Sequence, residues 1–219
     1  MSNNPSARDD EIEVLAGPIT LAGHLTIPDA TKGVVVFAHG SGSSRKSPRN
    51  RAVAQSLNEV GLATLLFDLL TRDEEADRAN VFDIELLAGR LLDVTSWLHD
   101  QEGLTNIPVG YFGASTGAAA ALWAAADPKS GVLAVVSRGG RADLAGSKLP
   151  HVRAATLLIV GGFDDVVIAL NQQAQAQLRC ENQLVIVPEA THLFEEPGAL
   201  EKVAQLASDW FLKYLVKKT

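Results

Sequence analysis

The sequence predicts an α/β fold with a mostly parallel central sheet and helices on both faces. Six short apolar runs lack polar alternation, as expected of strands that are buried on both faces. The stretches between them carry apolar residues three or four positions apart, the spacing of an amphipathic helix. This alternation continues from about residue 30 and indicates right-handed βαβ crossovers. The expected strands are residues 33–38, 63–67, 108–112, 132–137, 155–161 and 183–187.

The segment ahead of these strands has a different pattern. In residues 11–27, apolar side chains flank Gly17-Pro18, which predicts an antiparallel hairpin at the edge of the sheet. Residues 1–10 are expected to form a flexible tail. Further along, residues 84–98 and 200–214 have helical spacing, and the alanine-rich residues 118–126 favour a helix. Because no repeat or linker interrupts the chain, we expect a single domain over residues 1–219.

Composition narrows the possible functions. The chain has 219 residues, is 47% hydrophobic and carries a formal net charge of −7, which suits one globular domain and disfavours nucleic acid as a partner. A single cysteine excludes an internal disulfide and a zinc site built on several thiolates. We find no signal peptide and no run of about 18 apolar residues. The expectation is a cytoplasmic protein without membrane or nucleic-acid partners.

The strongest motif is Gly-Ala-Ser-Thr-Gly at residues 113–117, between an expected strand and an expected helix. In this position a Gly-x-Ser-x-Gly sequence indicates a nucleophile elbow, in which a tight turn exposes the hydroxyl of Ser115. The amide of Thr116, at the start of the helix, is then placed to stabilise an oxyanion. The alternative is a simple Gly-Ser turn that joins a strand to a helix.

A serine nucleophile needs a base and a group that orients the base. Of the two histidines downstream, His192 follows the last expected strand at its carboxyl end, whereas His151 precedes a strand. We therefore predict His192 as the base. Asp164 and Asp165 follow the preceding strand, and we favour Asp164 as the acid, with Asp165 capping the helix that begins near Val166.

A second oxyanion donor is expected from the loop after the strand at residues 33–38. That strand ends in His-Gly-Ser-Gly at residues 39–42, where glycines let the main chain approach a ligand. Ser41 is the favoured amide donor and Gly42 is the second choice, while His39 is expected to brace the loop. The alternatives are a phosphate-binding loop and a flexible turn, although the dinucleotide pattern G-x-G-x-x-G is absent.

Two basic clusters lie beside the expected site. One begins at Arg45 and the other contains Arg138 and Arg141, so we predict these arginines as substrate-binding residues that select an anionic ester. The alternative is solvated loop charge. The segment of residues 138–154 is too short for a helical cap, which favours an open site and small or exposed substrates.

With these residues in place, the chain resembles the α/β hydrolase superfamily and, within it, the dienelactone hydrolase-like serine hydrolases. The resemblance spans roughly residues 12–215, and its motifs lie at residues 39–42, 113–117, 161–167 and 190–194. It implies an α/β hydrolase fold without a cap domain. The implied activity is that of a carboxylesterase that works through an acyl-enzyme on a small-molecule ester, with no metal or organic cofactor.

One residue departs from the family pattern. Dienelactone hydrolase proper has a cysteine at the elbow, where this chain has Ser115, and its one thiol, Cys180, lies in a polar stretch far from the motif. This favours simple ester hydrolysis over dienelactone turnover. The alternatives that remain open are a thioesterase, a lactone or dienelactone hydrolase with the same triad, and a non-catalytic binding module on this fold.

Overall fold

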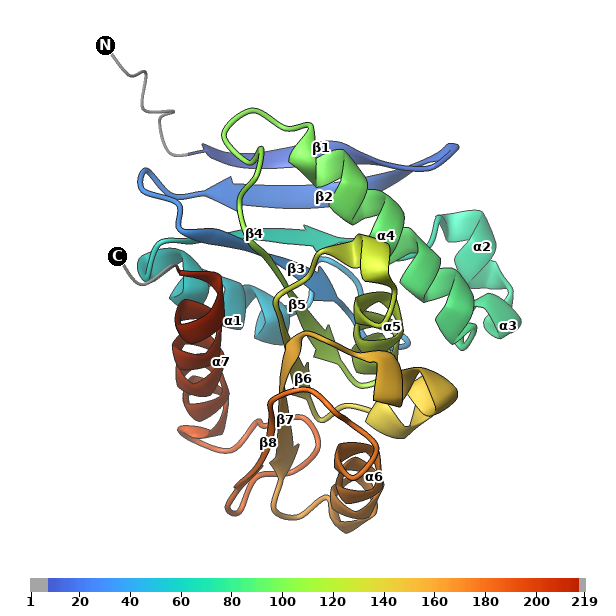
Figure 1. Cartoon of the computed structure of the whole chain (residues 1–219), viewed down its shortest axis with the longest axis vertical. Helices are drawn as coiled ribbons and strands as arrows, with labels where there is room; N and C mark the ends of the chain where they lie inside the picture. The colour runs from blue at the N-terminus through green and yellow to red at the C-terminus, as the bar shows by residue number, and fades with distance from the viewer. Residues whose placement is uncertain (1–7, 217–219) are drawn as a thin grey trace.

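A computed structural model of the chain describes residues 8–216 and confirms the α/β fold (Figure 1). Its central sheet has eight strands in the order β1-β2-β4-β3-β5-β6-β7-β8. Each expected strand is present, with ends that differ by a residue or two. The strands are β1 Arg8–Ala16, β2 Ile19–Ile27, β3 Gly33–Ala38, β4 Leu62–Phe67, β5 Val109–Ala114, β6 Ala134–Arg138, β7 Ala155–Gly161 and β8 Asn182–Val187.

The N-terminal hairpin forms one edge of the sheet. β1 pairs with β2 and β2 pairs with β4 in antiparallel fashion, whereas all other neighbours are parallel. The hairpin begins earlier than the sequence indicates, because Arg8 already pairs with Ile27. Residues 8–10 of the expected tail therefore belong to β1, and residues 1–7 lie outside the described part. Exposed polar residues fill the start of this edge strand, so no apolar run marks it.

Helices cover both faces of the sheet (Figure 1). α1 and α7 pack on one face around Leu57 and Phe211, and α4 and α5 pack on the other around Leu91 and Leu122. The expected helices at residues 84–98 and 200–214 correspond to α4 and α7. The helices are α1 Pro48–Glu59, α2 Arg72–Ala76, α3 Arg78–Val81, α4 Ile84–His99, α5 Thr116–Ala125, α6 Asp165–Gln175 and α7 Ala199–Leu215.

The connection between β6 and β7 stays short. It contains a 3₁₀ segment, Ala142–His151, and across residues 8–216 no separate cap domain is evident. This agrees with the expectation from its length and leaves the carboxyl ends of the strands uncovered by a second domain. In the described part of the chain, no helix combines the length and the apolar character needed to cross a membrane.

Candidate active site

Ser115 lies in a tight turn between β5 and α5. Its backbone has φ 51° and ψ −123°, a conformation that residues other than glycine rarely adopt. The turn is fixed by packing, because a Cβ on Gly117 would lie 2.2 Å from the carbonyl oxygen of Ala38. The Ser115 N–H donates to the carbonyl of Arg138, at the end of the adjacent strand β6. The elbow expected from the motif is therefore present, with strained backbone at the serine.

The predicted base and acid are in direct contact. Nδ1 of His192 lies 2.6 Å from Oδ2 of Asp164, and the imidazole is partly exposed whereas the carboxylate is largely buried. The ring also lies over Gly139, where an added Cβ would be 3.4 Å from Nδ1 and from Cε1. Because Gly139 directly follows the residue that accepts the Ser115 N–H, this contact brings the imidazole to the elbow.

Asp164, not Asp165, faces the imidazole. Asp164 occupies the N-cap position of α6 but its side chain makes no capping hydrogen bond, since its carboxylate turns to His192. Asp165 is the first residue of the helix, so the N-cap position lies at Asp164, one residue earlier than expected. Within residues 8–216 no hydrogen bond joins the Ser115 hydroxyl to the imidazole; such catalytic contacts are often long before substrate binds.

The loop between β3 and α1, residues 39–47, here called the oxyanion loop, packs directly on Ser115. A Cβ on Gly40 would lie 2.9 Å from Cβ of Ser115 and 3.7 Å from its Oγ. At the start of α5, the Thr116 N–H has no hydrogen-bond acceptor among the described residues, as expected of an oxyanion donor. The Ser41 N–H is engaged, because it donates to the Thr116 hydroxyl at 2.9 Å. The two residues predicted to donate, Ser41 and Thr116, thus lie in contact, but the Ser41 N–H is already bound to the Thr116 side chain.

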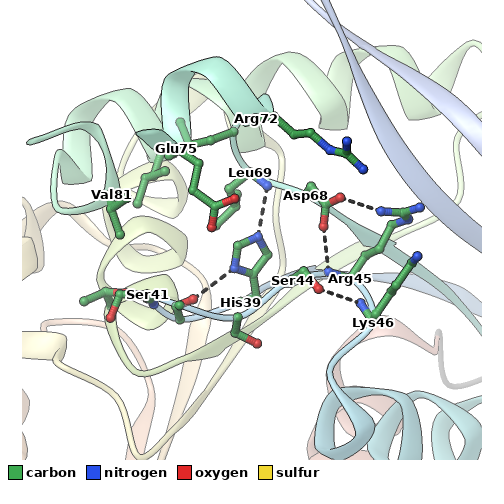
Figure 2. Close-up of a pocket in the computed structure, with 16 residues that line it drawn as sticks. His39, Ser41, Ser44, Arg45, Lys46, Asp68, Leu69, Arg72, Glu75 and Val81 are labelled. Atoms are coloured by element: carbon green, nitrogen blue, oxygen red, sulfur yellow. Dashed lines mark hydrogen bonds and ion pairs between the residues drawn. The ribbon is translucent and has the colours of Figure 1, made fainter. Parts of the chain in front are cut away.

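His39 braces this loop, as its position suggests. Its Nε2 accepts from the Leu69 N–H at 3.1 Å, which leaves Nδ1 protonated to donate to the Gly40 carbonyl at 3.0 Å (Figure 2). Burial lowers the pKa of His39, partly offset by its hydrogen bond to Gly40 and the charge of Asp68. Both ring nitrogens are used, so His39 holds the loop against the end of β4 and has no free nitrogen for acid–base chemistry.

The three predicted arginines have different surroundings. The guanidinium of Arg45 pairs with Asp68, which also accepts the Arg45 N–H (Figure 2). Glu11 forms a second ion pair with Arg45. The guanidinium of Arg141 makes two hydrogen bonds to the carboxylate of Asp143, at 2.9 and 2.8 Å. These ion pairs commit Arg45 and Arg141 to neighbouring acids, which the sequence did not indicate.

Arg138 differs from the other two. It is 8% exposed, and its Nε and Nη1 are buried without a hydrogen-bond acceptor. Burial lowers the pKa of Arg138 to about 10, and the positive charge of Arg49 acts in the same direction. A buried guanidinium with two unsatisfied donors is costly unless an anion or water completes it.

A cavity of about 220 Å³ adjoins the oxyanion loop at Ser41 and Thr116 (Figure 2). Its remaining walls come from the segment between β4 and α4, which the sequence analysis did not assign to the site. The signal available was the position of this segment, directly after a strand whose carboxyl end lies beside β3. The residues from this segment are Asp68, Leu69, Leu70, Arg72, Glu75 and Val81, and Leu87 of α4 completes this wall. In the described chain, no cluster of three or more His, Cys, Asp or Glu side chains could hold a metal ion.

Solved structures identify the family. A crystal structure of dienelactone hydrolase from Anabaena variabilis is 57% identical to the chain and matches it with a TM-score of 0.92, covering 96% of this chain and 99% of that one. The chain belongs to the dienelactone hydrolase family. The chain also resembles the esterase Est1E from Butyrivibrio proteoclasticus, with a TM-score of 0.79, 17% identity and coverage of 93% of this chain and 98% of that one, a likeness that concerns the fold alone. No protein-family model matches the chain.

Two longer proteins also match the chain. Two proteins from strains of Mycobacterium tuberculosis, each named "Putative phosphoribosyl transferase", are 65% identical over 212 residues, or 97% of this chain. The match covers 48% of each of them, so the chain spans about half the length of these curated relatives. The resemblance to α/β hydrolases expected from the motifs is confirmed, and the 57% identical dienelactone hydrolase supports hydrolase chemistry.

Proposed function

We propose that the chain is a serine hydrolase that cleaves carboxylic esters of small or exposed substrates through an acyl-enzyme. The observation that carries this proposal is the 2.6 Å contact between Asp164 and His192 beside the strained elbow at Ser115. A carboxylate on Nδ1 selects the tautomer whose Nε2 is a base. Together with the half-buried serine at the elbow, this is the machinery of acyl transfer.

The reaction follows from these positions. His192 takes the hydroxyl proton as Ser115 Oγ attacks the ester carbonyl, and Asp164 stabilises the imidazolium that forms. The negative charge of the tetrahedral intermediate develops at the start of α5, next to the Thr116 N–H. The imidazolium then protonates the leaving alcohol. His192 next takes a proton from the water that attacks the acyl-enzyme and returns it to Ser115 Oγ, so that the carboxylic acid leaves and the serine hydroxyl is restored.

The cavity beside the oxyanion loop supports small substrates. Its volume of about 220 Å³ is below the range of roughly 300–1,000 Å³ that is usual for drug-sized ligands. Leu69, Leu70, Val81 and Leu87 give it an apolar side, and the rest of its lining is glycine, polar or charged. We propose that one substituent of the ester lies here while the remainder stays exposed.

Replacement of the nucleophile tests the proposal. Ser115→Ala should lower kcat for a short p-nitrophenyl ester by roughly 10³–10⁶ and leave the far-UV circular dichroism spectrum unchanged. The comparison is made with purified wild type and variant at equal concentration. Turnover near the wild-type rate in the variant would exclude the serine mechanism.

Arg138 supports a finer proposal, that the ester carries an anionic group. Its Nε and Nη1 have no acceptor, and the adjacent Arg49 adds positive charge. A substrate carboxylate near the guanidinium would compensate this buried charge. Wild type should therefore cleave a carboxylate-bearing ester at a higher kcat/KM than its uncharged analogue. Arg138→Gln should abolish the preference, whereas the exposed Arg153→Gln should keep it. Equal rates on both esters in wild type would contradict this proposal.

A lactone is the second candidate substrate, because of the 57% identity to a dienelactone hydrolase. A lactone is a cyclic ester, so the same attack, proton transfer and acyl-enzyme apply, with the leaving alcohol still attached. A panel of an ester, a thioester and an enol lactone, each compared by kcat/KM, separates the candidates. If wild type turns over none of them and Ser115 resists acylation, the chain is a binding module.

A further inference from the structure

We propose that the side-chain hydroxyl of Thr116 is a catalytic oxyanion donor, through which the Ser41 amide acts. This inference rests on the proposed ester hydrolysis. The observation behind it is the 2.9 Å hydrogen bond from the Ser41 N–H to Thr116 Oγ1. The Ser41 amide, which was expected to bind the oxyanion directly, therefore donates to the hydroxyl of the residue that follows Ser115.

The hydroxyl has a proton to give. Thr116 is 5% exposed, and its Oγ1 accepts from Ser41 while no residue in the described range 8–216 accepts its proton. Buried hydroxyls normally use their donor, so this proton lacks a partner that a bound intermediate could supply. The Thr116 N–H is likewise without an acceptor among these residues. Two donors of the residue that follows Ser115 are thus uncommitted.

The geometry favours donation to the oxyanion. An oxygen atom held by the Thr116 N–H lies close to the β-hydroxyl of the same residue, which can point its proton at that oxygen and still accept from Ser41. A hydroxyl that accepts a hydrogen bond is polarised and becomes a better donor. Its bond to an oxyanion is charge-assisted and stronger than a bond between neutral groups. The proton stays on Oγ1 throughout, so no covalent bond changes.

The loop does not need this hydrogen bond as a brace. His39 ties the loop to the Leu69 N–H, and close packing of Gly117 against Ala38 fixes the loop to α5. The competing reading is that the hydroxyl blocks the Ser41 amide and must move away before catalysis. The two readings predict opposite effects when the hydroxyl is removed, since a blocking group would raise activity on its loss.

The test replaces the hydroxyl with groups of similar size. Thr116→Val should lower kcat for a p-nitrophenyl ester about 10²-fold with KM little changed, as for loss of one oxyanion donor. Thr116→Ser should stay within a few-fold of wild type, because it restores the hydroxyl. The matched control is Thr95→Val, which removes a buried hydroxyl that bonds Leu91 and Tyr111 in the core and should leave kcat unchanged.

A second readout separates catalysis from folding. A trifluoromethyl ketone forms a tetrahedral oxyanion with the serine, so its Ki should rise in Thr116→Val by the same factor by which kcat/KM falls. Thr116→Ala serves if the valine variant does not fold, with the same expected loss. Equal or higher activity in either variant, or a Thr116→Ser enzyme as impaired as Thr116→Val, would overturn the inference. Ester turnover by wild type that persists in Ser115→Ala, or no turnover by wild type, would instead remove the proposed function.

Discussion

The direction of one carboxylate distinguishes the two candidate acids. Asp164 and Asp165 are adjacent in sequence, and the helix that follows could use either of them at its first turn. Asp164 has φ −107° and ψ 61°, and its Oδ2 lies 2.6 Å from Nδ1 of His192. Asp165 begins the helix itself. Because the Asp164 carboxylate binds the imidazole, it does not cap the helix.

Substitution of each aspartate separates their roles. Asp164→Asn should lower kcat for a short ester by about 10⁴, because an amide no longer holds the catalytic tautomer of His192. Asp165→Asn should change kcat by less than a few-fold, since it contributes only to the first turn of α6. Steady-state kinetics on both variants decide the matter. Loss of activity in Asp165→Asn alone would mean that the assignment is wrong.

The oxyanion loop is the element that links the site to the sheet. His39 joins its start to the end of β4, and it does so in its neutral form, because Nε2 must accept from the Leu69 N–H. Burial lowers the pKa of His39 in the folded chain. The unfolded chain therefore binds the proton first as the pH falls, and protonation favours unfolding.

The stability of the protein should reflect this linkage. The free energy of unfolding should be fully retained above the pKa of an unfolded histidine, about 6.5, and should decrease as the pH falls below it. His39→Gln should show a weaker decrease between pH 7.5 and 5, while the exposed His151→Gln should behave as wild type. Urea unfolding at several pH values measures the effect. Identical pH dependence in wild type and His39→Gln would contradict it.

Elements and long-range contacts differ in how far the sequence predicts them. The buried strands were predictable because both of their faces meet a core, which leaves continuous apolar runs. The position of His192 after the last strand predicted that it would lie near Asp164, and the two side chains are in contact. The bond from Ser41 to Thr116 and the ion pair of Arg45 with Asp68 join residues that are 75 and 23 positions apart. Such contacts depend on side-chain directions after folding, which no local pattern encodes.

At the scale of the whole molecule, one sheet with a core on each face brings the site together. The loops after β3, β5, β7 and β8 supply the oxyanion loop, the elbow at Ser115, Asp164 and His192. Because these strands are parallel, the loops lie together at the carboxyl ends of the strands, where sites of α/β folds form. The segment after β4 adds the cavity wall (Figure 2). This unit matches about half the length of each of the two curated mycobacterial relatives.

We propose that this assembly activates Ser115 as a nucleophile. Incubation of the intact protein with a fluorophosphonate, followed by mass spectrometry of the protein and of its peptides, measures activation and position together. We expect one adduct per chain, located on Ser115, absent in Ser115→Ala and formed much more slowly in Asp164→Asn. An unmodified wild-type protein, or an adduct that forms equally in Ser115→Ala, would contradict the account.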